Sequence, residues 1–181
     1  MSDIGGLEKG NDMNTSEPCA MRRRLCLAAP ALLGAGVLAG CGGHPAKAPY
    51  STFSLLDGST LYSSAFVNKV ALVNFWATTC SYCLSETPQL AALYNSHHAR
   101  GLEVVAVALA SDRAERLARV AQSRQLPYPV AHDRDGSIAR QWGGIRVTPT
   151  TFVVDRQGRI ARRFMGARLH DVTALIDQLM A

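Results

Sequence analysis

Two cysteines near the middle of the chain have a spacing that suits redox chemistry. Cys80 and Cys83 are separated by two residues in the stretch "NFWATTCSYCLSETP", residues 74–88. Two sulfurs at this spacing can close a disulfide ring, bind a soft metal ion together, or lie as two apolar side chains in a core. The elements that carry the pair favour one of these uses over the others.

The residues around the pair predict a buried strand followed by a helix. Residues 70–77, "VALVNFWA", form a continuous apolar run, as expected of a strand buried on both faces. Residues 80–98 then place apolar side chains at helical spacing. Cys80 therefore opens a helix, where unpaired N–H groups and the helix dipole favour the thiolate, the nucleophile of disulfide exchange. Cys83 lies one turn further on, so it would resolve the mixed disulfide that Cys80 forms.

Two other uses of the pair stay open at this stage. A tetrahedral zinc site needs four ligands, but the body of the chain has no second cysteine pair, and His97 and His98 fall at the far end of the predicted helix. A Cu(I) site would need the two thiolates alone, which suit that soft ion. Two structural core cysteines are the remaining alternative, although the order strand, Cys-x-x-Cys, helix favours a redox pair.

The rest of the body alternates strands and helices. Short strands surround an Asp57-Gly58 turn, and a late β-hairpin surrounds a turn at Gly158. The pattern also predicts strands over 102–109 and 128–133, and helical segments over 112–126, 137–144 and 169–180. The arginines of the 112–126 helix are interpreted as a solvated face. We predict an α/β fold with a mixed central sheet flanked by helices.

The composition fits one globular domain with additional length at one end. The chain has 181 residues, of which 48% are hydrophobic, and a net charge of +5. Its basic residues are spread along the sequence without a clustered block, which argues against nucleic acid as a partner. Of the five cysteines, Cys19, Cys26 and Cys41 belong to the N-terminal segment. The one remaining pair is not a disulfide framework.

The N-terminal segment has the order of a bacterial secretory signal. Met21 is followed by three arginines and then by an apolar run over 25–38. This run is too short for a membrane-spanning helix, which needs about 20 residues. The run ends in "LAGC", residues 38–41, which resembles the lipobox of bacterial lipoproteins. That resemblance implies cleavage before Cys41 and attachment of lipid to this cysteine, which would anchor the chain stably. An uncleaved anchor helix is the alternative.

These features divide the chain into four parts. Residues 1–20 resemble no part of a signal and are interpreted as a leader from an overcalled translation start. Residues 21–40 are predicted to be the lipoprotein signal peptide, residues 41–50 a lipidated tether, and residues 51–181 the folded domain. Both the lipoprotein and the anchor alternative place this domain outside the cytoplasm at a membrane. Gly42, directly after the lipid cysteine, favours the outer membrane.

With these motifs in place, the sequence resembles the thioredoxin superfamily, specifically the TlpA/ResA-like branch of membrane-anchored thiol–disulfide oxidoreductases. The resemblance covers residues 50–181 and is carried by "FSLLDG", "LVNFWATTCSYCLSETP", "GIRVTPTTFVVDRQGRI" and the closing helix. It implies a thioredoxin-like fold with an N-terminal β extension and an extra α/β insertion. The joint pattern of Trp76, the cysteine pair, Glu86 and Thr148-Pro149 makes the resemblance specific.

The resemblance also implies how a substrate is bound. It implies a cis peptide bond at Thr148-Pro149 that faces the cysteines, since cis bonds occur almost entirely before proline. The backbone of Thr148 would then pair with a bound substrate strand, in the manner of strand addition. Trp76 and Tyr82 are the other residues expected to bind substrate.

Glu86 and Asn74 are interpreted together. Thioredoxin has a buried aspartate six residues before its first active cysteine, where this chain has Asn74, which cannot ionise. The TlpA-like branch instead has a glutamate three residues after its second cysteine, and Glu86 holds that position. Glu86 shares a face of the predicted helix with Cys83, so its carboxylate could accept or return the proton of the resolving thiol.

The function that the resemblance implies is reduction of disulfides in exported proteins by a lipid-anchored periplasmic enzyme. It implies no metal and no cofactor beyond the redox-active Cys80–Cys83 disulfide. The implied partners are protein thiols and disulfides in the periplasm, a membrane electron donor, and the lipid bilayer through Cys41. A family-typical substrate would be the haem-attachment cysteines of an apocytochrome c.

Two departures from the family leave the direction of electron flow open. Thr79 and Tyr82 stand where the family usually has a tryptophan and a proline before its two cysteines, and residues at these positions tune the reduction potential. A thiol oxidase or isomerase is therefore an alternative function. A Cu(I) chaperone of the Sco type is another, although that family places three residues between its cysteines.

Overall fold

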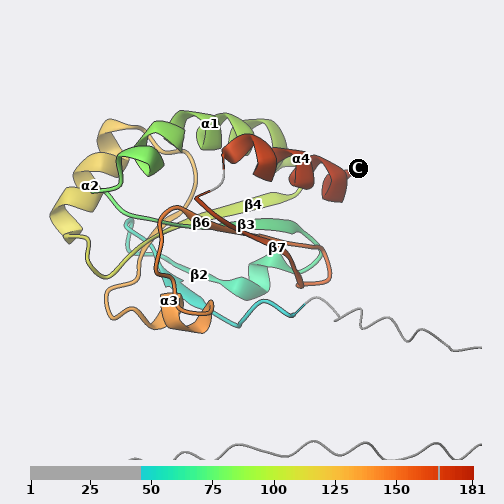
Figure 1. The fold of residues 1–181 in the computed structure, drawn as a ribbon, viewed down its shortest axis with the longest axis horizontal. Helices are drawn as coiled ribbons and strands as arrows, with labels where there is room; N and C mark the ends of the chain where they lie inside the picture. Colours follow the sequence, from blue (N-terminus) through green and yellow to red (C-terminus); the bar gives the residue numbers. More distant parts are fainter. Residues whose placement is uncertain (1–45, 167) are drawn as a thin grey trace, which may run out of the picture. The chain divides into compact units, whose positions relative to one another are not determined.

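The computed structural model describes residues 46–166 and 168–181, and its centre is a mixed five-stranded sheet (Figure 1). The strand order is β5-β4-β3-β6-β7. β3 pairs in parallel with β4 and antiparallel with β6, so it is the central strand, and all its residues are buried. The strands are β3 (Val70–Trp76), β4 (Leu102–Ala108), β5 (Val130–His132), β6 (Thr150–Val154) and β7 (Ile160–Met165).

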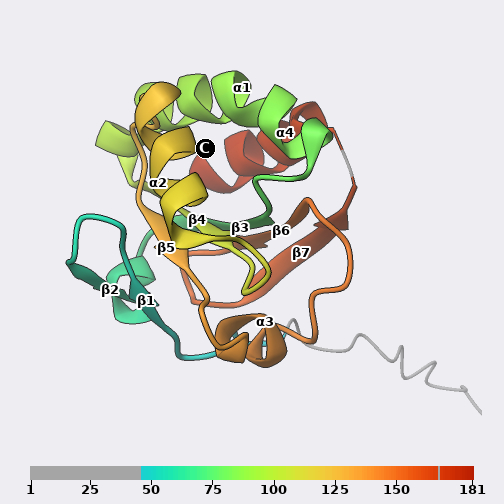
Figure 2. The same cartoon turned by 90° about the vertical axis from the view of Figure 1, so that its left-hand side faces the viewer.

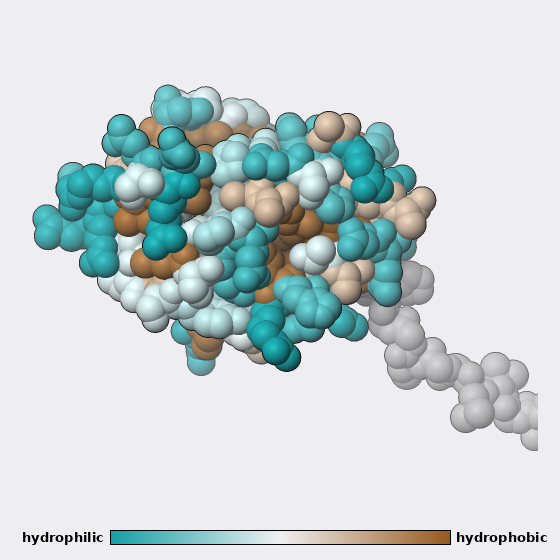
Figure 3. All heavy atoms as spheres, turned by 90° about the horizontal axis from the view of Figure 1, so that it is seen from above, coloured by the Kyte–Doolittle hydropathy of each residue, from teal (hydrophilic) through white to brown (hydrophobic). Residues whose placement is uncertain are grey.

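Helices cover both faces of this sheet (Figures 1 and 2). Because side chains alternate along a strand, Leu72 and Trp76 of β3 pack toward one helical layer, whereas Val73 and Phe75 pack toward the other. The surface of the first layer is mostly hydrophilic, and apolar side chains show in the gaps (Figure 3). The first layer contains α1 (Ser81–His97), α2 (Ala114–Ser123) and α4 (Leu169–Met180), and the second contains α3 (Ser137–Gln141).

A small β-hairpin precedes the sheet in the chain. Its strands are β1 (Thr52–Ser54) and β2 (Thr60–Tyr62), which pair antiparallel around the predicted turn. Trp142, next to α3, donates a hydrogen bond of 3.0 Å from Nε1 to Ser51 Oγ, which ties the hairpin to α3. The hairpin is the expected N-terminal β extension. An additional α/β unit follows β4: α2 leads to β5, which is the edge strand of the sheet beside β4.

The predicted elements are confirmed in type and order, but several are shorter than expected. The helix predicted over 112–126 begins at Ala114, because the side chain of Asp112 turns toward the end of β3 and binds Thr78. α1 continues through Pro88. A short 3-10 turn over Ser63–Phe66 follows β2, and another over His98–Arg100 follows α1.

The predicted leader, signal peptide and lipid-bearing Cys41 lie outside the described residues. Across residues 46–166 and 168–181, every helix falls short of the length and apolar character that a membrane span requires.

Candidate redox active site

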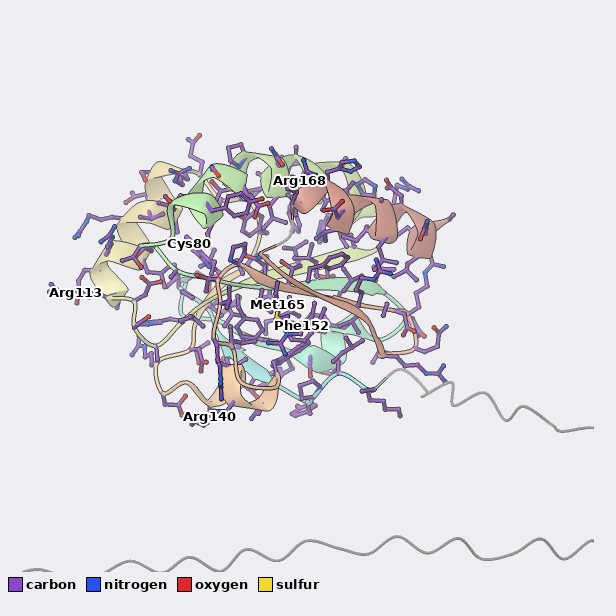
Figure 4. All side chains as sticks on the ribbon, in the orientation of Figure 1. Cys80, Arg113, Arg140, Phe152, Met165 and Arg168 are labelled. Atoms are coloured by element: carbon purple, nitrogen blue, oxygen red, sulfur yellow. A yellow bond between two sulfur atoms is a disulfide. The ribbon has the colours of Figure 1, made fainter. Side chains whose placement is uncertain are left out.

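Cys80 and Cys83 are joined by a disulfide at the start of α1, where Figure 4 labels Cys80. Their Cα atoms lie 5.3 Å apart. After β3 ends, a turn over residues 77–80 is closed by a hydrogen bond of 3.0 Å from the Cys80 N–H to Ala77 O, and it delivers Cys80 to the N-cap of α1. Cys80 Sγ accepts a hydrogen bond of 3.1 Å from the Cys83 N–H, one of the donors that a helix start leaves unpaired.

The two sulfurs differ in accessibility. Cys80 is half-buried, whereas Cys83 is 5% exposed and belongs to the apolar cluster under α1. A molecule that approaches from solvent therefore meets Cys80 first. This arrangement agrees with the predicted order of attack by Cys80 and resolution by Cys83.

The loop before β6 places a backbone carbonyl against the pair. The peptide bond between Thr148 and Pro149 is cis, as the resemblance implies. Thr148 O lies 3.6 Å from Cys80 Sγ. The loop is fixed to β7 by a hydrogen bond of 2.9 Å from the Gly166 N–H to Pro149 O. A strand bound along the backbone of Thr148 would pass beside Cys80.

Glu86 lies close to Cys83, as the helical spacing predicts. It is half-buried and lines the same small pocket as Cys83 and Pro149. Glu86 Oε1 accepts a hydrogen bond of 2.9 Å from the Leu169 N–H, at the start of α4. Burial raises the pKa of Glu86, while the hydrogen bonds from Leu169 and Tyr82 act in the opposite direction. The link to α4 is a second role for Glu86 that the sequence did not indicate.

Asn74, a residue of β3, also lines this pocket. Its Nδ2 donates a hydrogen bond of 2.8 Å to Thr151 Oγ1, directly across on β6. The amide is therefore satisfied by a neutral partner, and the carboxyl group that lines this pocket together with Cys83 is that of Glu86.

The expected role of Trp76 as a substrate contact stays a prediction. Trp76 is 2% exposed and packs in the apolar cluster beneath α1, where it also lines the small pocket beside Cys83. Tyr82 is 41% exposed and stays a candidate contact. Two further exposed apolar side chains flank the loop before β6: Val147 precedes Thr148, and Met165 lies opposite Thr150 in the β6–β7 pairing.

The sequence reasoning missed three residues that hold the backbone on both sides of the pair. Asp112 accepts a hydrogen bond of 2.9 Å from the Thr78 N–H, before Cys80. Arg116 donates to Thr78 O over 3.1 Å, and Arg124 donates to Leu84 O over 2.8 Å, after Cys83.

A signal for the first contact was present in the sequence. Asp112 follows strand β4 as Cys80 follows strand β3, and parallel neighbours end at the same edge of a sheet. Arg116 lies on α2 and Arg124 directly follows it, and Figure 1 shows α2 beside the start of α1. They were interpreted from the sequence as a solvated face.

The described side chains offer few ligands for a metal ion. Within the two described ranges, no group of three or more His, Cys, Asp or Glu side chains gathers around one point. A copper site here would therefore rest on Cys80 and Cys83 as its sulfur ligands.

Comparison with known proteins agrees with this geometry. The sequence profile of the Redoxin family matches residues 45–179. The thiol-disulfide oxidoreductase ResA of Oceanobacillus iheyensis is 34% identical over 100 residues, which are 55% of this chain and 50% of that protein. ResA of Bacillus thuringiensis subsp. konkukian is 30% identical over 109 residues, or 60% of this chain and 61% of that one. The chain thus spans half to three fifths of the length of these curated relatives.

The fold has a matching neighbour among solved structures. A thiol:disulfide interchange protein of the thioredoxin family from Chlorobium tepidum superposes with a TM-score of 0.70 at 26% identity, covering 76% of this chain and 98% of that one. The residues that the Redoxin profile matches contain the central sheet, the cysteine pair and the loop at Pro149. The chain belongs to the Redoxin family, as a TlpA/ResA-like member of the thioredoxin superfamily.

Proposed function

We propose that the chain is a thiol–disulfide oxidoreductase that works through Cys80 and Cys83. The observation that carries the proposal is the arrangement of the pair: a half-buried Cys80 at the start of α1, bonded to a buried Cys83, with Cys80 Sγ 3.6 Å from Thr148 O. The similarity to proteins named thiol-disulfide oxidoreductase ResA supports it.

In the reducing direction, the reaction begins from the dithiol form. The Cys80 thiolate attacks one sulfur of the substrate disulfide, whose S–S bond breaks and whose other sulfur leaves as a thiolate and takes a proton. Cys83 then loses its proton, for which Glu86 is the acceptor we favour, and attacks Cys80 Sγ. The second substrate thiol is released. Two electrons have passed to the substrate, and the Cys80–Cys83 disulfide remains, with no other cofactor required.

The disulfide must be reduced again before the next turnover, so the cycle needs a dithiol donor. We propose that this donor is a membrane protein, and that the substrates are disulfides of exported proteins, such as the haem-attachment cysteines of an apocytochrome c. The signal-like segment before Cys41 supports a periplasmic, lipid-anchored location, and Gly42 favours the outer membrane.

Reduction potential is the measurement that tests this function and its direction. The full-length chain is equilibrated with a series of glutathione buffers, and the Cys80–Cys83 peptides are followed by mass spectrometry after alkylation. A potential near about −270 mV, as in thioredoxin, would establish a reductase, and one near about −120 mV, as in DsbA, would reverse the direction to oxidation. If no disulfide forms between these two cysteines at any potential, the proposed function is wrong.

A further inference from the structure

Every hydrogen-bonding group of Thr78 is held by one short segment at the start of α2. Thr78 is fully buried, two residues before Cys80. Its N–H donates to both carboxylate oxygens of Asp112, over 3.1 and 2.9 Å, and its hydroxyl donates to Asp112 Oδ1. Its carbonyl accepts a hydrogen bond of 3.1 Å from Arg116 Nη2. Asp112 is itself 7% exposed, so these contacts are shielded from water.

Thr78 lies inside the turn that presents the nucleophile. The turn over 77–80 is closed by the hydrogen bond between Cys80 N and Ala77 O. Figure 4 shows Cys80 at the start of α1 and Arg113, the residue after Asp112, at the start of α2 on the same side of the molecule. A side chain that fixes Thr78 therefore fixes the backbone that leads directly into Cys80.

We infer that Asp112 is a positioning residue for this site. Its hydrogen bonds to Thr78, together with that of Arg116, set the reduction potential of the Cys80–Cys83 pair. The inference rests on the proposed function and deepens it. Asp112 touches neither sulfur among the contacts of the described residues, so it acts through Thr78 and the turn rather than on the substrate.

Two physical effects of Asp112 act in the same direction. Its carboxylate is hydrogen-bonded to Thr78, the second residue before Cys80, and a negative charge there disfavours a thiolate on the Cys80 sulfur. The fixed turn also holds the two cysteines in the arrangement of the disulfide, so that closing the ring costs less entropy. Both effects favour the disulfide over the reduced pair, and so they lower the reduction potential.

The experiment compares the reduction potentials of the parent full-length chain and three variants in glutathione buffers. Asp112→Asn should shift the equilibrium toward the dithiol by about three- to tenfold, which corresponds to a rise of about 14 to 30 mV. Thr78→Val removes only the hydroxyl contact and should give a smaller rise. Thr78→Ser keeps that hydroxyl and should restore the parent value.

Asp133 provides a matched control. It is 1% exposed and accepts hydrogen bonds of 3.0 and 2.8 Å from the Ile138 and Ala139 N–H groups, but it does so at α3, on the other face of the sheet. Asp133→Asn should lower the melting temperature and leave the potential at the parent value. A loss of stability alone can therefore be told apart from a change at the redox pair.

Two outcomes would overturn the inference, and the parent protein distinguishes them. If the parent titrates normally while Asp112→Asn and Thr78→Val keep its potential and lose only stability, Asp112 is merely structural and the proposed function stands. If the parent itself forms no exchangeable Cys80–Cys83 disulfide, the proposed function fails and the inference fails with it.

Discussion

The half-buried Cys80 and the buried Cys83 make the order of the exchange steps testable at single residues. Cys83→Ser keeps the accessible sulfur and removes the group that resolves the mixed disulfide. Attack can then occur but resolution cannot, so a mixed disulfide between Cys80 and its natural partner should accumulate. We expect a heavier, reductant-sensitive species on non-reducing gels of cells quenched with acid and an alkylating agent.

Cys80→Ser is the control for this experiment, because it leaves the sulfur that lies in the core. It should trap little or nothing under the same conditions. Trapping that is equal in both variants would contradict the assigned order of the two cysteines, and trapping by Cys80→Ser alone would reverse it.

The half-buried carboxyl of Glu86 predicts a dependence of stability on pH. Burial raises its pKa above the ordinary value of 4.5, so the folded protein holds this proton more tightly than the unfolded chain does. Its contribution to stability is therefore fully present below the unfolded pKa and is lost as the pH rises through the folded pKa. Glu86→Gln removes this titration while keeping an acceptor for the Leu169 N–H.

The measurement is the free energy of unfolding of parent and Glu86→Gln at several pH values from 4.5 upward. The parent should lose stability relative to the variant as the pH rises. Glu115→Gln, at an exposed position of α2, controls for the loss of one negative charge. A difference between parent and Glu86→Gln that stays constant across this window would remove Glu86 as a source of pH dependence.

Single residues also show where sequence reasoning succeeds. The positions of Cys83 and Glu86 followed from spacing along one helix, which geometry makes reliable. The burial of Trp76 did not follow from its residue type, since exposure is set by the strand that carries it, and β3 is buried throughout. Asp112 was missed because its partner, Thr78, lies 34 residues away in sequence, so the contact is indicated only by the parallel pairing of β3 with β4 and not by a local pattern.

At the scale of elements, the strands were predictable because their burial leaves a continuous apolar run, as in β3. The bounds of α2 were less predictable. The helix was predicted over 112–126, but Asp112 binds Thr78 and Gln125 adopts a positive φ of 49°, so the helix is confined to Ala114–Ser123. Helix ends depend on tertiary contacts that the periodicity does not contain.

The attachment of α2 to the sheet can be tested through Leu117. This side chain is fully buried in the cluster beneath α1 and α4. Leu117→Ala should lower the free energy of unfolding by about 2–5 kcal/mol, because a cavity replaces its contacts. Urea denaturation followed by tryptophan fluorescence measures this loss.

Arg119→Ala, at an exposed position on the same helix, should change the free energy of unfolding by no more than about 0.5 kcal/mol. If Leu117→Ala were equally mild, α2 would be loosely attached. Asp112 and Arg116, at its start, could then not hold Thr78 in a fixed place.

At the scale of the whole molecule, the redox domain and the N-terminal segment bear on two different aspects of function. The domain's geometry concerns which sulfur reacts, and the segment before Cys41 concerns where the reaction takes place. The sequence is the sole source for the second aspect, because Cys41 and the residues before it lie outside the described ranges. The proposed location therefore needs its own test.

That test is the variant Cys41→Ser in cells separated into membrane and soluble fractions. If lipid on Cys41 anchors the chain, the parent should be found with the membranes and should take up a labelled fatty acid, and Cys41→Ser should lose both properties. Cys26→Ser, within the apolar run, is the control and should behave as the parent. A Cys41→Ser variant that stays with the membranes would instead favour the uncleaved anchor helix. It would leave the chemistry of the pair untouched, because that chemistry depends on residues of the folded domain alone.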